Sequence, residues 1–177
     1  MTLKRVWIVA AVVWCLAGMC ATPVWAEDTD VSRATLAGLQ GVHVIVEEMQ
    51  DNVRKYAKRF GLTQAQVQKD VEERLRRGGI RTVTGDEWLA VPGRPILYVN
   101  INTHETEKYW YAYDVKVELR QVVTLVSDPQ VKTMAVTWSL NMTGQANIGT
   151  LDVIRQDTNI LVERFVEAWK KAGRDQK

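Results

Sequence analysis

The sequence predicts an α+β fold, in which an antiparallel sheet of about five strands carries two main helices on one face. The first observation is that residues 109–125 alternate between apolar and polar side chains, as in an antiparallel sheet with one buried face. The second is that 63–77 and 148–173 repeat apolar residues every three or four positions, the spacing of a half-buried helix. Because helices and strands do not alternate regularly, a parallel doubly wound sheet is not expected.

The first 26 residues are typical of a cleavable export signal. Two basic residues precede the uncharged, mostly apolar stretch Val6–Met19, and the segment ends at Val24-Trp25-Ala26 before acidic residues. The apolar stretch has 14 residues, fewer than the roughly 20 that span a bilayer. We therefore expect cleavage after Ala26, a periplasmic or secreted protein and no stable membrane span after cleavage. The alternative is that the segment is retained as an N-terminal anchor.

Charge and cysteine content exclude several functions. Removing Lys4 and Arg5 from the 23 basic residues leaves 21, equal to the 21 acidic residues. A neutral chain argues against general nucleic-acid binding, which needs clustered positive charge. Both cysteines, Cys15 and Cys20, precede the cleavage point, and Met19 before Cys20 makes a poor lipidation site. The processed chain is therefore expected to have no disulfide, thiol nucleophile or thiolate metal site.

The first half of the processed chain is expected to form a strand and two helices. Residues 27–35 are polar and predict a flexible segment, followed by a single α+β domain over 36–173. Alternation predicts a strand at 42–47. Helices are predicted over about 50–60 and 63–77, the second with a Thr63–Gln66 capping box and a Gly78-Gly79 stop.

The second half is expected to be mainly sheet. The predicted elements are a short strand at 80–84, a loop at 85–95, a strand at 96–101, a hairpin connection at 102–108, a strand at 109–126, a strand at 131–140, a loop at 141–147 and a final helix at 148–173. The 109–126 strand would be roughly 60 Å long at about 3.3 Å per residue, so it is expected to bend or to project beyond the sheet. Gln121, a lone polar residue on its apolar side, is expected to hydrogen-bond the backbone at a bend.

The densest aromatic cluster predicts a partner-binding site. Its residues are Tyr109, Trp110, Tyr111 and Tyr113. Since Trp110 lies on the opposite side of the strand from the tyrosines, aromatic rings occupy both faces, and exposed Tyr and Trp are common binding anchors. The alternative is that a loop or the N-terminal segment covers Trp110.

Candidates for catalysis are few. His43 and His104 are the two histidines, and neither belongs to a recognised metal or triad motif, so no catalytic residue, metal or cofactor is assigned. Glu47, Glu48 and Asp51 are the only clustered carboxylates, and they are more typical of acids at a helix start than of an acid–base pair.

One further similarity comes from the order of motifs. The segments GLTQAQVQKDVEERLRRGGI, ILYVNIN and TWS, with a long strand and a C-terminal helix, resemble a group of uncharacterised exported bacterial proteins. The element order is also distantly similar to the amino-terminal domain of TolB and to envelope lipoproteins of that topology. Such a likeness of topology assigns no catalytic residue.

Together these observations predict a non-enzymatic exported interaction module that binds an envelope protein or a glycan. Two alternatives remain open. One is an envelope hydrolase that uses the clustered carboxylates, and the other is a small lipid-binding protein.

Overall fold

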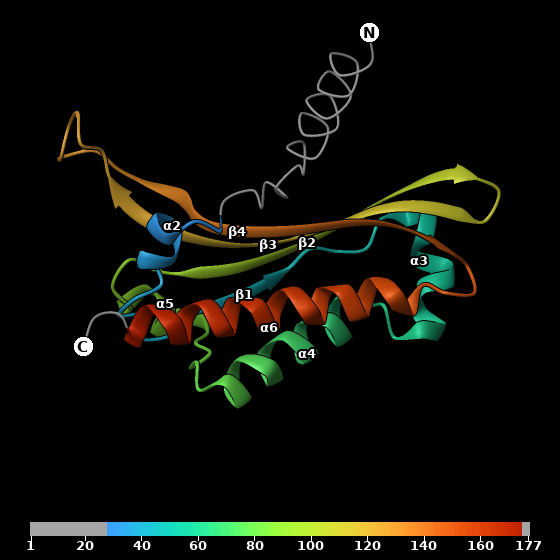
Figure 1. Ribbon diagram of the computed structural model, residues 1–177, viewed down its shortest axis with the longest axis horizontal. Coiled ribbons are helices and arrows are strands. Elements are labelled where there is room, and N and C mark those ends of the chain that lie inside the picture. Colours follow the sequence, from blue (N-terminus) through green and yellow to red (C-terminus); the bar gives the residue numbers. More distant parts are fainter. Residues whose placement is uncertain (1–27, 175–177) are drawn as a thin grey trace, which may run out of the picture.

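The computed structural model describes residues 28–174, so the predicted signal at 1–26 lies outside the described residues. The described chain is an α+β fold with a four-stranded sheet and five α-helices, of which three have seven residues or more. The sheet forms one layer, and α4 (Gln64–Gly78) and α6 (Asp152–Arg174) form a second layer on one of its faces (Figure 1). The other face of the sheet carries no long helix, as Figure 1 shows.

The sheet is mixed, and the prediction of about five antiparallel strands was wrong in this detail. Its strands, in spatial and chain order, are β1 (His43–Val46), β2 (Ile96–Glu107), β3 (Trp110–Thr124) and β4 (Lys132–Asn147). β2, β3 and β4 form an antiparallel meander, whereas β1 pairs with β2 in parallel. A parallel pair needs a long crossover, which the helices between residues 47 and 95 provide.

The predicted strand at 80–84 is reduced to a single bridge between Val42 and Thr82. Val42 donates to the carbonyl of Arg81 and accepts from the amide of Val83, at 2.9 and 3.0 Å. The chain then enters α5 (Gly85–Ala90), within the stretch predicted as a loop. The ladder therefore ends after two hydrogen bonds.

The helices of the crossover begin and end close to the predicted positions. α3 (Asp51–Ala57) continues into a 3₁₀ turn at Lys58–Phe60, and α4 follows. The Thr63 side chain accepts from the Gln66 amide at 3.2 Å, which is one half of the predicted capping box. The reciprocal bond, from the Thr63 amide to the Gln66 side chain, is absent because the Gln66 side chain is turned toward Asp70 and donates to its carboxylate.

β2 and β4 are longer than predicted, because the polar stretches 102–107 and 141–147 belong to strands. Their polar side chains alternate with buried ones such as Thr103 and Ala146, so they occupy the solvated face of a continuous ladder. Polarity alone had suggested loops.

The core lies between the sheet and the two long helices. Every second residue of β3 from Tyr111 to Leu119 is buried and faces them. Trp138 of β4 packs edge-on against Phe165 of α6, with ring centroids 5.1 Å apart. These contacts confirm the helical stripe and the alternating strand from which the fold class was predicted.

The pairing of β3 with β4 shifts in register between Leu119 and Arg120, where Thr137 of β4 is the extra residue of a β-bulge. Beside it, the Gln121 side chain donates to the carbonyl of Thr35 at 3.2 Å and to the Thr137 hydroxyl at 2.8 Å. This confirms the role predicted for Gln121.

The first described residues differ from the flexible segment predicted at 27–35. They form the short helix α2 (Asp30–Ala34), with a reciprocal capping box between Thr29 and Ser32. Leu36, which follows it, is fully buried. Among residues 28–174, we find no helix that combines the length and the apolar character required to cross a bilayer.

Candidate functional site

The structure divides the four aromatic residues predicted as a binding site. Tyr109 and Trp110 are 41% and 45% exposed, whereas Tyr111 and Tyr113 are 1% and 6% exposed. Tyr111 and Tyr113 belong to the buried face of β3, and their hydroxyl groups are also engaged. In this conformation only Tyr109 and Trp110 offer aromatic surface to a partner.

The two buried tyrosines anchor the end of the sheet to the helices. The Tyr111 hydroxyl donates to the carbonyl of Asn52 in α3 at 3.1 Å, and the Tyr113 hydroxyl donates to Asp157 of α6 at 2.5 Å. Burial raises the pKa of both tyrosines, and for Tyr113 the Asp157 carboxylate raises the pKa further. Both phenols therefore stay protonated and serve as structural donors.

Tyr109 is held in an unusual conformation at the turn between β2 and β3. Its φ of 69° lies in the left-handed region, which costs a residue with a side chain about 1–2 kcal/mol. Its amide donates to the Glu105 carboxylate at 3.1 Å, and its carbonyl accepts from the Ile148 amide at 3.1 Å. The ring packs edge-on against Tyr56 at 6.1 Å. These contacts fix the ring on the helix side of the turn.

Trp110 lies on the opposite face, beside a depression in the open side of the sheet. The depression has a volume of about 680 Å³ and is lined by Gln50, Asn102, Thr103, His104, Ala112, Tyr113, Asp114, Thr143, Gly144 and Gln145. We call it the Ala112 hollow, because Ala112 is the small residue between His104 on β2 and Gln145 on β4 in the sheet register. Trp110 is two residues from Ala112 along β3 and therefore shares its face.

The polar groups around the Ala112 hollow are of two kinds. Some are already paired: Gln50 donates to Asn102 at 3.2 Å, and Asn141 donates to Asp114 at 3.3 Å. Others have no hydrogen-bond partner within residues 28–174, namely the side chains of His104, Thr143 and Gln145. An imidazole, a hydroxyl and an amide together offer both donors and acceptors to a ligand that carries many hydroxyl groups.

The clustered carboxylates considered for hydrolysis do not converge on one another. Glu48 and Asp51 each pair with Arg54, at 3.2 and 3.1 Å, and their side chains are 73% and 91% exposed. Glu47 accepts from Asn100 on the neighbouring strand. The Arg54 guanidinium therefore lies between Glu48 and Asp51. None of the three carboxylates is in a desolvated position, which an acid–base pair requires.

The two histidines are likewise far from any metal-binding arrangement. His43 Nδ1 lies 3.0 Å from the carbonyl of Val83, and the ring lies 5.7 Å from Trp88. No group of three or more potential ligands among His, Cys, Asp and Glu occurs in the part of the chain that the structure describes.

Sequence reasoning missed the Ala112 hollow, although it identified Trp110. The alternation in 109–120 already assigned Trp110, Ala112 and Asp114 to one face. The polar residues of the neighbouring strands could not be added, because 102–107 and 141–147 were predicted as connections and their register was unknown. The available signal was Ala112, a small residue between Trp110 and Asp114 on the solvated face of the strand, where a depression can form.

Comparisons with known proteins add little to this geometry. No family model matches the chain, and no curated protein matches it. A solved structure, a minor lipoprotein from Acinetobacter baumannii, covers 79% of this chain and 95% of its own, with 8% identity and a TM-score of 0.30. A likeness of this size supports no conclusion about the fold or the function of this chain.

Proposed function

We propose that the chain is an exported, non-enzymatic interaction module that binds a glycan of the cell envelope in the Ala112 hollow. The observation that carries the proposal is the exposed Trp110 ring beside a depression whose rim consists of polar side chains. One face of a sugar ring consists of C–H groups that pack on an aromatic ring, while its hydroxyl groups need donors and acceptors at the edge.

The composition of the rim favours a glycan over a protein partner. The buried centre of a protein interface is mainly apolar, with several large side chains in contact. Here Tyr111 and Tyr113 are withdrawn into the core, so Trp110 is the one large aromatic group on the open face of β3. The hollow next to it is lined by amides, hydroxyl groups and an imidazole instead.

The proposal is tested by titrating the protein with soluble β-1,4-linked N-acetylglucosamine oligomers and following the indole N–H resonance of Trp110 by NMR. A Trp110→Phe variant assigns the resonance. We expect this resonance to shift on titration, and we expect Ala112→Arg, which fills the hollow from a half-buried strand position, to abolish binding. Lys116→Ala on the same face is the matched control and should bind normally.

Unchanged Trp110 resonances at millimolar oligomer would contradict the glycan proposal. In-cell crosslinking from a photoreactive residue at position 110 then provides a second measurement. Recovery of one dominant envelope protein would assign the same surface to a protein partner.

A further inference from the structure

The end of the molecule opposite the Ala112 hollow exposes an unusual amount of apolar side chain. We define the tip hairpin as residues 122–136, the distal part of β3 and β4 with the turn between them. Five of the ten exposed large hydrophobic residues described in the structure belong to it: Leu125, Val126, Val131, Met134 and Val136. The side chain of Val126 at the turn is completely exposed. Scattered exposed hydrophobic residues are ordinary, but a concentration on one projection indicates a contact surface.

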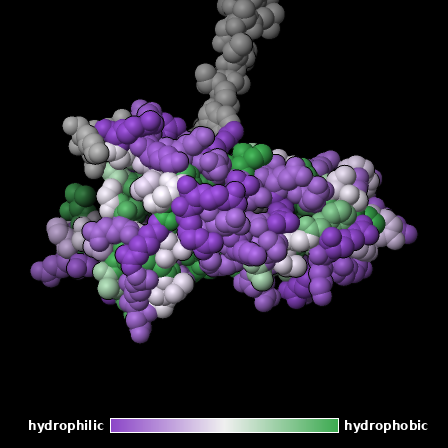
Figure 2. Space-filling view, turned by 90° about the horizontal axis from the view of Figure 1, so that it is seen from below, coloured by the Kyte–Doolittle hydropathy of each residue, from purple (hydrophilic) through white to green (hydrophobic). Residues whose placement is uncertain are grey.

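The tip hairpin extends beyond the layer of helices, and residues 124–134 are all exposed, whereas Val122 and Val123 at its base are half-buried. It leaves the sheet after the bulge at Leu119/Arg120 and projects at the left of Figure 1. Val122 pairs with Met134 across it, and Thr124 pairs with Lys132. In the space-filling view, hydrophobic atoms reach the surface at this same left end (Figure 2).

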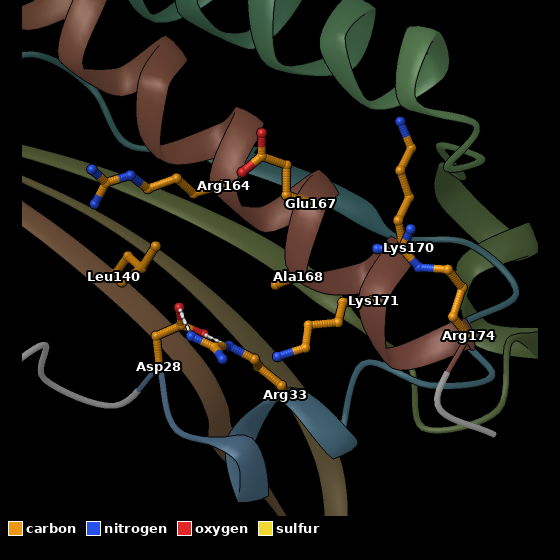
Figure 3. Close-up of a pocket in the computed structure, with 9 residues that line it drawn as sticks. All are labelled: Asp28, Arg33, Leu140, Arg164, Glu167, Ala168, Lys170, Lys171 and Arg174. Atoms are coloured by element: carbon orange, nitrogen blue, oxygen red, sulfur yellow. Dashed lines mark hydrogen bonds and ion pairs between the residues drawn. The ribbon is translucent and has the colours of Figure 1, made fainter.

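A cationic pocket lies between α6, β4 and the first residues of the described chain (Figure 3). Its volume is about 600 Å³, and it is lined by Asp28, Arg33, Leu140, Arg164, Glu167, Ala168, Lys170, Lys171 and Arg174. Five of these nine residues are basic and two are acidic. The end of α2 connects the pocket to the hairpin, because the Thr35 carbonyl accepts from Gln121 at 3.2 Å and the Thr35 hydroxyl donates to Thr137 at 3.3 Å.

One of the two acidic residues of this pocket, Asp28, is neutralised by neighbouring side chains. Asp28 accepts two hydrogen bonds from Arg33, both 2.8 Å, and one from the Trp138 indole at 2.8 Å. Burial alone would raise the pKa of Asp28, but these donors lower it below its usual range. Lys170, Lys171 and Arg174 have no ion pair within residues 28–174, so their charges are available to an external anion.

The chain enters the described fold at the same place. Asp28 lies in the wall of the cationic pocket, and the residues before it in sequence are the predicted signal or anchor, with the apolar stretch Val6–Met19. Any membrane attachment through that segment would therefore bring this end of the fold to the bilayer.

We propose that this end docks on the surface of a bilayer that contains anionic phospholipid. The apolar side chains of the tip hairpin enter the interface, and the basic residues of the cationic pocket bind phosphate headgroups. Buried apolar area and attraction between basic side chains and anionic lipid are the two contributions that hold a protein at a membrane interface. The two features lie side by side here, and the Ala112 hollow remains free at the other end.

The test uses the full chain with Cys15→Ser and Cys20→Ser, so that an introduced cysteine is unique whether or not the N-terminal segment is retained. An environment-sensitive fluorophore is attached at Val126→Cys. We expect its emission to shift to the blue with vesicles of 30% phosphatidylglycerol in phosphatidylcholine, and to stay unchanged with phosphatidylcholine alone. The same label at Ile160→Cys, an exposed apolar position on α6, is the matched control and should not respond.

The charge contribution is tested on the same labelled chain. Lys170→Glu together with Lys171→Glu should raise the lipid concentration needed for half of the shift by about tenfold or more. Lys69→Glu, an exposed lysine on α4, should leave it unchanged.

Three results would overturn the proposal. One is no spectral shift with anionic vesicles. Another is an equal shift at position 160, which would indicate unspecific adsorption. The third is a shift that grows with protein concentration in the absence of lipid, which would assign the tip hairpin to contact with a second copy of the chain.

Discussion

Gly144 of β4 shows how closely single residues are fitted at the end of the sheet near the Ala112 hollow. A Cβ atom there would overlap the ring of Tyr113, the residue opposite it in the β3–β4 register. The absence of a side chain lets the tyrosine cross the sheet surface and reach Asp157. Gly144 is therefore required by close approach rather than by backbone conformation.

We predict that Gly144→Ala lowers the free energy of unfolding by about 1–3 kcal/mol, because overpacking forces the Tyr113 ring away from its hydrogen bond. Urea denaturation followed by far-ultraviolet circular dichroism measures the change. Gly173→Ala is the control: nothing lies within 4 Å of its added methyl group, and a helical Ala should be neutral or stabilising by up to about 1 kcal/mol. Equal stabilities of Gly144→Ala and the parent chain would contradict this account.

At the residue scale, the sequence predicted which face of β3 each side chain occupies, but not which residues that side chain contacts. Alternation correctly separated Trp110 from Tyr111 and Tyr113. Burial of the two tyrosines depends on Asn52 and Asp157, which come from helices 59 and 44 residues away along the chain. No local pattern connects positions so far apart, so the four aromatic residues were predicted as one site.

The pairing of α4 with α6 illustrates the scale of elements. Gly78 brings the helices together, because a Cβ there would overlap Val166. About two turns closer to the start of α4, the Asp70 carboxylate accepts from Arg155 Nε at 2.5 Å and from Arg155 Nη2 at 3.0 Å. Burial would raise the pKa of Asp70, but its bonds from Arg155 and Gln66 lower it below the usual value. The ion pair is thus a fixed contact between the two long helices.

Asp70→Asn should lower the free energy of unfolding at pH 7 by about 1.5–3 kcal/mol, since a partly buried, charge-assisted contact is lost. Because the folded-state pKa of Asp70 is depressed, its contribution is fully present above the unfolded value near 4 and is lost as the pH falls further. The difference in the free energy of unfolding between the parent chain and Asp70→Asn should therefore shrink below about pH 4. Denaturation curves at pH 7 and pH 3.5 measure both effects.

Glu163→Gln is the control for that variant, because Glu163 joins the same two helices but is 53% exposed and lies 3.4 Å from Arg74. Exposed pairs contribute little, so a change below about 0.5 kcal/mol is expected. A loss as large as that of Asp70→Asn would show that helix spacing, rather than the partly buried Asp70–Arg155 pair, determines the effect.

Helices and strands whose apolar residues recur at regular spacing were predicted well, whereas strand segments with mainly polar residues were not. α4, α6 and the centre of β3 follow from their stripes. The ends of β2 and β4 were predicted as loops because a solvated strand face resembles a connection in sequence. The parallel pairing of β1 could not be predicted, since period-two patterns carry no information about strand direction.

At the scale of the whole molecule, β3 separates two surfaces of different chemistry. Trp110 begins the strand at the Ala112 hollow, and Thr124 ends it on the tip hairpin. At about 3.3 Å per residue the strand holds these surfaces roughly 45 Å apart. On the proposals above, a bilayer held at the tip hairpin would leave the hollow facing away from the membrane, toward envelope glycan.

The parallel pairing of β1 with β2 also determines the order in which the chain assembles. β2, β3 and β4 join through short turns, whereas β1 must wait for a crossover of about fifty residues to close, at a greater cost in chain entropy. We expect pulse-labelled hydrogen exchange during refolding to protect the amides of β3 before those of His43 and Glu47, which donate to the carbonyls of Pro95 and Val99 at 2.9 and 3.0 Å. Simultaneous protection would contradict this order. If the chain emerges amino terminus first, the first strand to appear would then be the last to be placed, and its amides would stay unprotected until the rest of the sheet has formed.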